Sequence, residues 1–251
     1  MMPSPERLMD FSVVSAPSTA WELVDFGMNG VPPSNYTDAA VRFIKSQQTP
    51  AGNWSGNESR RPPMNAGEFQ SAAVCIYALK HYTPEGGEAT TAKAIARAVE
   101  WLENATPQTT QDRAFHALAL AWASDGSPGA SRAARALLAM QRPDGGWNQL
   151  PGMPSDAYAT GQALFALATA AKMSPTEPAF QKGIDYLLKT QAADGTWHVQ
   201  TRSIWLQPYF ESGFPYGRDQ FISTAGTAWA AMALATAAPQ PSTSQARERE
   251  R

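Results

Sequence analysis

The pattern of apolar and polar positions along the chain predicts two kinds of helix. The first kind has one apolar and one polar face, as helices at a protein surface do, and is expected at residues 37–48, 91–103, 127–140 and 174–189. The second kind is apolar on almost every side and is expected at residues 68–82, 112–123, 156–171 and 222–237. A helix that is apolar all round belongs inside a protein. The alternation predicts four helical hairpins in two concentric layers, with the second helices lining a central concavity.

Capping sequences mark where several of these helices are expected to begin. Thr37 is expected to cap the helix that runs to about Gln48, and Thr19-Ala-Trp-Glu22 fits the capping box of a short helix over about 19–28. Ser127-Pro128 is a cap followed by proline at the first helical position. Ser174-Pro-Thr-Glu177 combines a capping box with proline at that same position.

One short turn recurs between the predicted helices. It is clearest in Gln141-Arg-Pro-Asp-Gly-Gly-Trp147 and Gln191-Ala-Ala-Asp-Gly-Thr-Trp197, and looser in Gln48-Thr-Pro-Ala-Gly-Asn-Trp54. The three tryptophans are 93 and then 50 residues apart, so one degenerate copy fits between the first two. A period of about 45 to 50 residues suits a helical hairpin with its loops, and predicts a repeat protein.

Composition narrows the possible functions. The net charge is −2 and no basic stripe is present, so nucleic acid is not expected as a partner. The single cysteine, Cys75, excludes an intramolecular disulfide and a thiolate cluster, and its apolar surroundings favour a small core residue. No eighteen apolar residues run unbroken, so no transmembrane segment is expected. As written the chain is expected to be cytoplasmic, and exported if the true start lies upstream.

The chain is expected to divide into three parts. Residues 1–36 form an N-terminal segment with a short helix, residues 37–237 form the repeat domain, and residues 238–251 form a disordered tail rich in Pro, Ser and charge. With four hairpins, and at most part of another in residues 1–36, the array is expected to be an open arc. Its apolar ends would need a cap, self-association, a protein partner or the rest of a larger ring.

The recurring turn resembles the QW repeat of squalene and oxidosqualene cyclases, whose fold is shared with protein prenyltransferase β subunits. The resemblance covers about residues 37–237 and implies an all-α fold, an α/α toroid that here is a partial or open ring of about four helical hairpins. It also implies a structural role for the turn, in which Gln bonds near the end of an outer helix and Trp packs beside it. The residues to which this role is carried over are Gln48, Trp54, Gln141, Trp147, Gln191 and Trp197.

The catalytic motifs of these families are incomplete in this chain. The cyclases protonate an alkene with the middle Asp of an Asp-x-Asp-Asp-Thr type motif, but in Asp156-Ala-Tyr-Ala-Thr160 that place is taken by Tyr158. A phenol with a pKa near 10 cannot protonate an alkene. The prenyltransferases place a zinc-binding His in an Asp-x-Tyr-His-Thr context, and Ala159 stands there instead. No metal or cofactor is therefore expected, and Asp156 and Tyr158 are weak catalytic candidates.

The segment 198–220, called the insertion below, is the most unusual part of the chain. Aromatic residues with a few charges at the rim of a concavity have the composition of a lid over a binding site. The alternative is a loop that covers the exposed end of the helical array, and the sequence leaves both open. Its candidate ligand-binding residues are Arg202, Trp205, Tyr209, Phe210, Phe214, Tyr216, Arg218 and Asp219.

Other titratable residues have simpler interpretations. Asp156 and Glu68 both stand at the starts of inner helices, where carboxylates are favoured as caps. His81, His116 and His198 are scattered over separate repeats without the spacing of metal ligands.

Two classes of function remain open. The first is a module that keeps the toroid without its chemistry and binds an apolar, isoprenoid-type small molecule or a protein partner in its concavity. The second is a terpene cyclase or related isoprenoid-processing enzyme with a divergent active site. Whether the chain is an enzyme is left open, because function belongs to the site and not to the fold.

Overall fold

The computed structural model describes residues 15–55, 62–64, 67–203 and 209–238. These residues form α-helices, one short 3₁₀-helix and a single isolated bridge between Asn148 and Ser155. The prediction of an all-α protein is confirmed. The α-helices are α1 (Ala16–Met28), α2 (Asn35–Ser46), α3 (Glu68–His81), α4 (Glu88–Asn104), α5 (Thr110–Ala123), α6 (Pro128–Leu138), α7 (Ala157–Ala170), α8 (Pro178–Thr190) and α9 (Gln220–Ala237), and the 3₁₀-helix is η1 (Gly217–Asp219).

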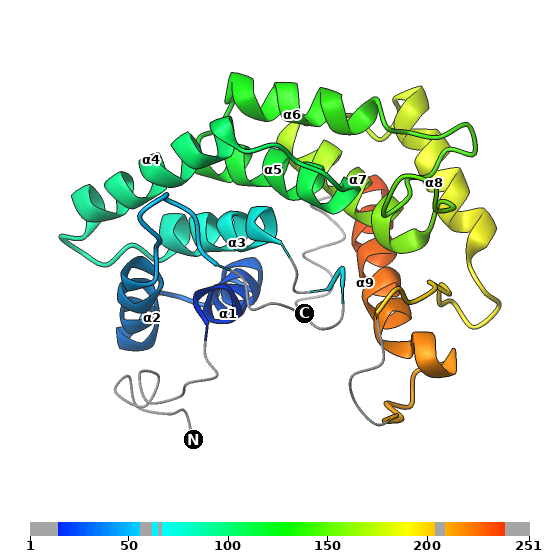
Figure 1. The fold of residues 1–251 in the computed structure, drawn as a ribbon, viewed down its shortest axis with the longest axis horizontal. Helices are drawn as coiled ribbons and strands as arrows, with labels where there is room; N and C mark the ends of the chain where they lie inside the picture. The colour runs from blue at the N-terminus through cyan, green and yellow to red at the C-terminus, as the bar shows by residue number, and fades with distance from the viewer. Residues whose placement is uncertain (1–14, 56–61, 65–66, 204–208, 239–251) are drawn as a thin grey trace, which may run out of the picture.

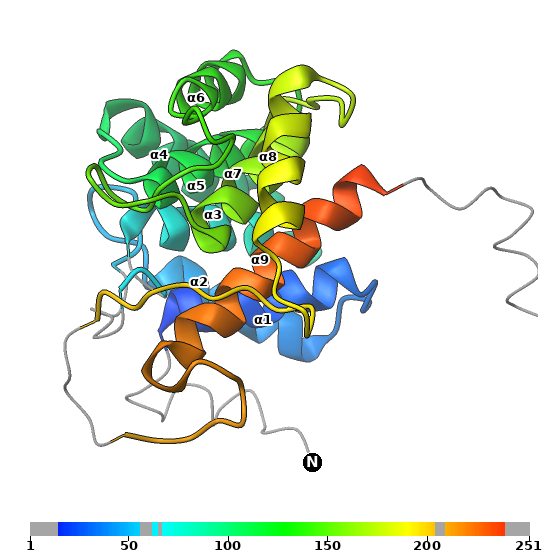
Figure 2. The same ribbon diagram turned by 90° about the vertical axis from the view of Figure 1, so that its right-hand side faces the viewer.

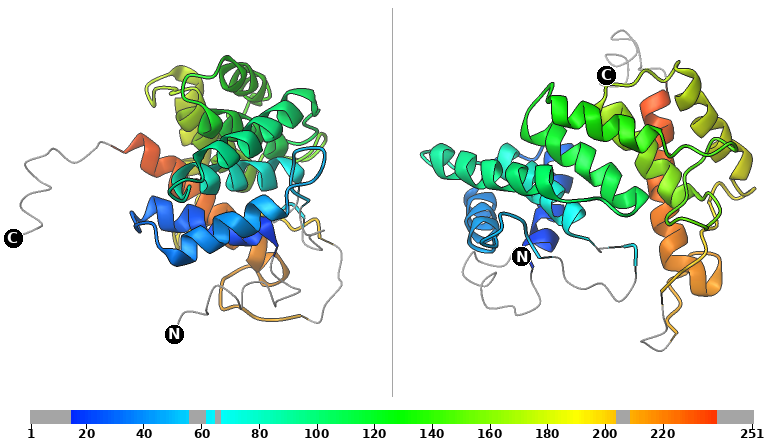
Figure 3. Two further views of the ribbon diagram at one scale, coloured as in Figure 1. Left: turned by 90° about the vertical axis from the view of Figure 1, so that its left-hand side faces the viewer. Right: turned by 45° about the horizontal axis from the view of Figure 1, so that its top comes forward.

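The helices form an arch with an inner and an outer layer (Figure 1). The inner layer is α1, α3, α5, α7 and α9, each packed against the next, and α2, α4, α6 and α8 lie outside it (Figures 1 and 3). Helix α3 shows why the second helices lie inside, because every residue from Phe69 to Leu79 is buried. Helix α1 extends the inner layer by packing on α3, so the N-terminal segment adds a fifth inner helix.

Small residues allow the inner helices to approach closely. A Cβ atom at Gly161 of α7 would lie 2.5 Å from the carbonyl carbon of Trp229 in α9, a distance that real Cβ contacts do not reach. This contact explains why α7 and α9 form the most extensive helix pair among the described residues. Alanine and glycine at these positions therefore set the spacing of the inner layer.

Aromatic rings of α1, α5, α7 and α9 contact one another, including rings from helices that are not neighbours in the inner layer. Phe115 of α5 makes edge contacts with Trp21 of α1, at a centroid distance of 6.2 Å, and with Trp229 of α9, at 5.9 Å. Phe165 of α7 adds an edge contact with Trp229 at 5.7 Å. Phe115 is fully buried, whereas the other three rings are partly exposed. We call these four residues the aromatic cluster.

Of the four helix starts expected from capping sequences, three are wrong and one is confirmed. Helix α2 is capped by Ser34, and Thr37 is the third helical residue of that capping box, with its hydroxyl accepting from the Ser34 amide at 2.9 Å. Helix α8 begins at Pro178, because Glu177 accepts from the Ser174 amide at 2.9 Å and closes a turn before the helix. Ser127 caps α6 as expected, accepting from the Ala130 amide.

Helix α1 starts earlier than its sequence suggested. Ser15 accepts from the Ser18 amide, so the helix begins at Ala16, three residues before Thr19. Pro17 lies in the first turn, where its missing N–H leaves no intrahelical bond unmade.

The repeated turn contacts the outer helix before it through its tryptophan and, in two copies, the outer helix after it through its glutamine. Each indole Nε1 donates to the carbonyl oxygen ten residues earlier, in the outer helix that precedes the turn. These bonds are Trp54 to Ile44 at 2.7 Å, Trp147 to Leu137 at 2.9 Å and Trp197 to Leu187 at 2.8 Å. All three indoles are buried. The glutamine Nε2 of the first two turns donates to the next outer helix, from Gln48 to Ala94 O and from Gln141 to Ala179 O, both at 2.8 Å.

The glycine of the turn is in contact with the next outer helix. Gly145 has a φ of +87°, and a Cβ atom there would lie 2.3 Å from the Lys182 carbonyl oxygen of α8. Gly52 is equivalent, with a φ of +99° and a Cβ position 2.4 Å from the Arg97 carbonyl oxygen of α4. Gly195, in the last turn, has no such backbone neighbour, because the nearest atom to its Cβ position is Gln191 Nε2 at 3.9 Å. The turn thus holds successive outer helices together.

We expect Gly145→Ala to lower the free energy of unfolding by about 1–3 kcal/mol more than Gly152→Ala. Gly152 is the matched control, since its φ of +85° imposes the same backbone strain on alanine but no atom lies within 4 Å of its Cβ position. Urea denaturation of both variants measures the difference. Equal losses would show that the contact with α8 adds nothing.

Candidate functional site

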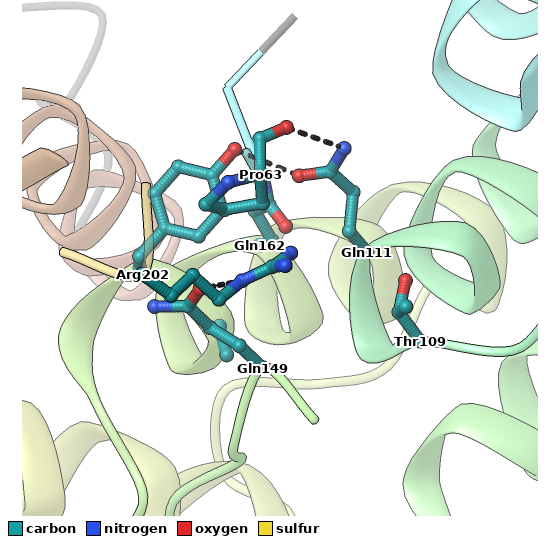
Figure 4. A pocket seen from close by; sticks show the side chains of 8 residues that line it. Pro63, Thr109, Gln111, Gln149, Gln162 and Arg202 are labelled. Atoms are coloured by element: carbon teal, nitrogen blue, oxygen red, sulfur yellow. Dashed lines mark hydrogen bonds between the residues drawn. The ribbon is translucent and has the colours of Figure 1, made fainter. Parts of the chain in front are cut away.

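A hollow lies where the N-terminal ends of α5 and α7 converge with three loops (Figure 4). Its volume is about 10 Å³. That is about the space that one water molecule needs, and far below the roughly 300 Å³ at which pockets for drug-sized ligands begin. The hollow therefore has room for one small polar group, such as a hydroxyl. Its lining residues are Pro63, Thr109, Gln111, Gln149, Tyr158, Ala159, Gln162 and Arg202.

Tyr158 and Gln111 form one wall of this hollow. The Tyr158 hydroxyl donates to Gln111 Oε1 at 2.8 Å, and Gln111 Nε2 donates to the Pro63 carbonyl oxygen at 3.1 Å (Figure 4). The same Nε2 also donates to Gln70 Oε1 at 3.1 Å. These bonds link α3, α5 and α7 through buried side chains. Because buried polar groups in a satisfied network hold one geometry, this wall is rigid.

Gln149 and Arg202 also line the hollow, and Asp156 is bonded to Gln149 without lining it. Asp156 is the N-cap of α7 and accepts from the Ala159 amide at 2.9 Å. Its other oxygen accepts from Gln149 Nε2 at 3.0 Å, while Gln149 Oε1 accepts from Arg202 Nε at 2.9 Å. The amide of Gln149 therefore bridges a carboxylate and a guanidinium, and it attaches the insertion to the start of α7.

The pKa of Asp156 is raised to about 6, because its carboxyl group is desolvated. Hydrogen bonds from Ala159 and Gln149 and the charge of Arg202 oppose that rise. The residue as a whole is half-buried, but the carboxyl group itself is enclosed by these partners. The raised pKa keeps a larger fraction of Asp156 protonated near neutral pH than an ordinary carboxyl group, although each proton is released less readily.

Burial also raises the pKa of Tyr158, so its phenol stays protonated and donates to Gln111. The Gln162 amide lies near this phenol and opposes the rise, although the two side chains fall short of hydrogen-bonding geometry. Of the two weak catalytic candidates, Tyr158 therefore lines the hollow, whereas Asp156 reaches it through its hydrogen bond with Gln149.

Gln162 is the least satisfied side chain of the hollow. It is 1% exposed, and neither its Nε2 nor its Oε1 has a hydrogen-bond partner. A buried polar atom left unsatisfied costs about 1–3 kcal/mol. Its amide therefore offers two unpaired N–H donors on Nε2 and an unpaired acceptor oxygen, Oε1.

Only part of the insertion reaches the hollow. Arg202 lines it, whereas Trp205 lies outside the described residues. Tyr209 and Phe210 are among the most exposed large hydrophobic residues, at 49% and 68%. Arg218 is exposed and Phe214 is half-buried, and neither lines the hollow. The lid therefore remains a prediction for the aromatic residues.

The rest of the insertion folds over the last repeated turn and the start of α9 (Figure 2). The Tyr216 hydroxyl is 2.6 Å from Thr196 Oγ1, and its ring stacks on His198 at 4.8 Å. Asp219 pairs with His198 Nε2 at 2.7 Å and accepts from the Thr201 amide at 2.9 Å. In the first and third hairpins the turn meets the next outer helix, so Tyr216 takes that place at the end of the array. This arrangement supports the cover interpretation for this half of the insertion.

The remaining titratable residues have local roles. Glu68 begins α3 without capping it, and instead accepts from Asn53 Nδ2 at 2.8 Å. Burial raises the pKa of the Cys75 thiol and lowers that of His116. Among the described residues, no three His, Cys, Asp or Glu side chains are grouped as metal ligands would be. None of the described helices is both long and apolar enough to cross a membrane.

Sequence reasoning missed the glutamines. Gln70 and Gln111 lie in the first turns of α3 and α5, Gln162 lies in the second turn of α7, and Gln149 lies in the loop before α7. Each is at most 7% exposed. Their signal in the sequence was a glutamine shortly after the start of three helices that are otherwise apolar, where a buried amide needs a partner.

We expect the Asp156→Asn variant to become more stable relative to the wild type as pH rises from 4 to 7. The folded protein raises the pKa of Asp156 above its unfolded value of 3.8, so the wild type loses stability as pH rises through about 6, whereas asparagine stays neutral. For a fully buried group, a pKa shift of this size changes the free energy of unfolding by about 3 kcal/mol. Because the residue is half-buried, we expect about 1–2 kcal/mol, measured by urea denaturation across this range.

Asp194→Asn is the control for this pH series. The Asp194 carboxylate accepts from Thr196, and these bonds lower its pKa. Its contribution to stability is lost as pH falls, so its variant should change relative to the wild type in the opposite direction. A pH-independent difference for Asp156→Asn would contradict the assignment of a buried, raised-pKa carboxyl group.

Comparisons with known proteins agree with this architecture. The family model described as the squalene-hopene cyclase C-terminal domain matches residues 104–250, more than half of the chain. The chain is also similar to the drimenyl diphosphate synthase of Streptomyces showdoensis, with 32% identity over 112 residues, covering 45% of this chain and 20% of that relative. The aligned part therefore spans about a fifth of the relative's length. The repeated Gln-to-Trp turns, the two helical layers and the family match together show that this chain belongs to the squalene-hopene cyclase C-terminal domain family.

Proposed function

We propose that this chain is a terpenoid-cyclase-like binding domain that holds an isoprenoid-type ligand on its concave face. The ligand's polar end enters the hollow and its apolar part lies over the aromatic cluster. The observation that carries this proposal is that one face of α7 and one face of α5 each change from polar to aromatic along the helix.

On α7, Tyr158, Gln162 and Phe165 are spaced at i, i+4 and i+7, so they lie along one face. Tyr158 and Gln162 line the hollow, and Phe165 belongs to the aromatic cluster. The polar end of this face is thus the N-terminal end of the helix. A ligand lying along it would meet hydrogen-bonding groups first and an aromatic ring about one turn later.

Helix α5 repeats this order. Gln111 in its first turn lines the hollow, and Phe115, four residues later, is the central ring of the aromatic cluster. The two faces are joined at their polar ends by the Tyr158–Gln111 bond and at their aromatic ends through Trp229. An amphiphile with a small head and an unsaturated hydrocarbon chain matches both ends of this surface.

The hollow supports binding better than alkene protonation. The Tyr158 hydroxyl is engaged as a donor to Gln111, and the two Asp156 oxygens accept from the Ala159 amide and from Gln149. The similarity to a protein named for drimenyl diphosphate synthesis supports a terpenoid as the class of ligand.

The alternative function is cyclisation of an isoprenoid, with Asp156 as a divergent acid. It is favoured by the place of Asp156 at the start of the family-like motif and by the enclosed position of its carboxyl group. Incubation with squalene and with prenyl diphosphates, followed by mass spectrometry, distinguishes the two. Cyclised products that disappear in Asp156→Asn would establish the enzyme and contradict a domain that only binds.

We expect Phe165→Ala to weaken binding of a C15 isoprenoid, such as farnesol or farnesyl diphosphate, by about tenfold. The reason is loss of ring contact area and of the packing that orients Trp229, and such aromatic contacts are worth about 1 kcal/mol or more. Equilibrium dialysis with radiolabelled ligand measures the dissociation constant.

Leu188→Ala is the matched control, because Leu188 is 54% exposed on the outer helix α8 and its loss removes a similar apolar surface. It should bind as the wild type does. Equal weakening in both variants, or no binding by the folded wild type to either ligand, would refute a concave isoprenoid site.

A further inference from the structure

We propose that the head group held in the hollow is an uncharged hydroxyl, and that Gln162 is the residue that selects it. This inference rests on the proposed isoprenoid site and specifies the ligand as an isoprenoid alcohol. Its starting observation is the Gln162 amide, which is 1% exposed, lines the hollow and has no partner for either polar atom.

A hydroxyl group can hydrogen-bond to either of the two unpaired polar atoms of this amide. Gln162 Nε2 can only donate and Oε1 can only accept, whereas a hydroxyl both accepts and donates. One alcohol oxygen can therefore satisfy either amide atom, and with one bound water it can satisfy both. A hydrocarbon would leave both amide atoms buried and unpaired, which is the costly state of a buried polar group.

The charges around the hollow disfavour a diphosphate. Arg202 is the one cationic lining residue among those described, and its Nε is already bonded to Gln149. Asp156, through Gln149, and Asp112 both offset its charge. The other polar lining side chains are neutral, namely those of Thr109, Gln111, Gln149, Tyr158 and Gln162. A diphosphate would bring several negative charges beside two carboxylates and a single guanidinium.

The geometry of the wall explains why the free amide belongs to Gln162. Gln111 is engaged with Tyr158, Gln70 and Pro63, and Gln149 is engaged with Asp156 and Arg202. Gln162 lies one turn beyond Tyr158 on α7, at the border between the polar and aromatic parts of the face. The head group of a ligand whose chain covers Phe165 would arrive at this position.

The test compares three C15 probes that share one hydrocarbon skeleton: farnesol, farnesyl diphosphate and farnesene. For the wild type we expect farnesol to bind about tenfold or more tightly than farnesene, and more tightly than the diphosphate. In Gln162→Leu we expect the preference of alcohol over hydrocarbon to disappear, because the unpaired amide is gone. This variant should also keep or raise the melting temperature, since it removes two unsatisfied buried atoms.

Gln181→Leu is the control, because Gln181 is exposed on the outer helix α8 and bonds only locally to the Pro175 carbonyl oxygen. It should keep the wild-type preference. Tighter binding of the diphosphate, or an alcohol preference that survives in folded Gln162→Leu, would overturn the hydroxyl site while leaving the isoprenoid site in place. Failure of all three probes to bind the folded wild type would refute the proposed function itself.

Discussion

The buried indole of each repeated turn is the contact on which the rest of the structure depends. In the third hairpin, Trp147 donates through Nε1 to α6, and its backbone amide donates to Thr160 Oγ1 of α7 at 2.9 Å. Its carbonyl oxygen accepts from the Asp156 amide at 3.0 Å. One residue thus fixes the end of an outer helix and the start of the next inner helix. Since the hollow is built from the starts of α5 and α7, its geometry follows from this turn.

The loop that carries this tryptophan also binds the preceding hairpin. Thr110 Oγ1, in the first turn of α5, donates to the Asn148 carbonyl oxygen in the loop after Trp147 at 2.6 Å. The starts of α5 and α7 are therefore held by one loop, and Gln111, Tyr158 and Gln162 are brought together from two hairpins. At the end of the array no further outer helix meets the turn among the described residues, and Tyr216 of the insertion contacts Thr196 there. Helix α9 leaves Thr224, Ala228, Ala231 and Ala235 exposed along its length.

Much of the fold followed from local patterns, because helix period and turn sequence are properties of neighbouring residues. Such local patterns predicted the four hairpins, the buried second helices and the cap at Ser127. The starts of α2 and α8 were not, because Ser34 and Thr37, or Ser174 and Glu177, offer competing caps a few residues apart. Which cap is used depends on how each helix packs on its neighbours.

The site was harder to predict, because its residues come from separate repeats. Asp156, Tyr158 and Arg202 were recognised by their chemistry, but the partners that define their roles are the amides of Gln111 and Gln149. A glutamine in an apolar helix gives no information about whether another side chain will satisfy it. Only the folded arrangement distinguishes Gln111, which is bonded on all sides, from Gln162, which is not.

The most direct test of the central claim is photo-crosslinking with an isoprenoid alcohol that carries a photoreactive group on its chain, followed by peptide mapping. A ligand on the concave face should label peptides from α5, α7 and α9, around Phe115, Phe165 and Trp229, and excess unlabelled farnesol should suppress this labelling. Labelling confined to the outer helices α2, α4, α6 and α8, or labelling that unlabelled alcohol does not compete, would contradict a ligand site built on the inner layer.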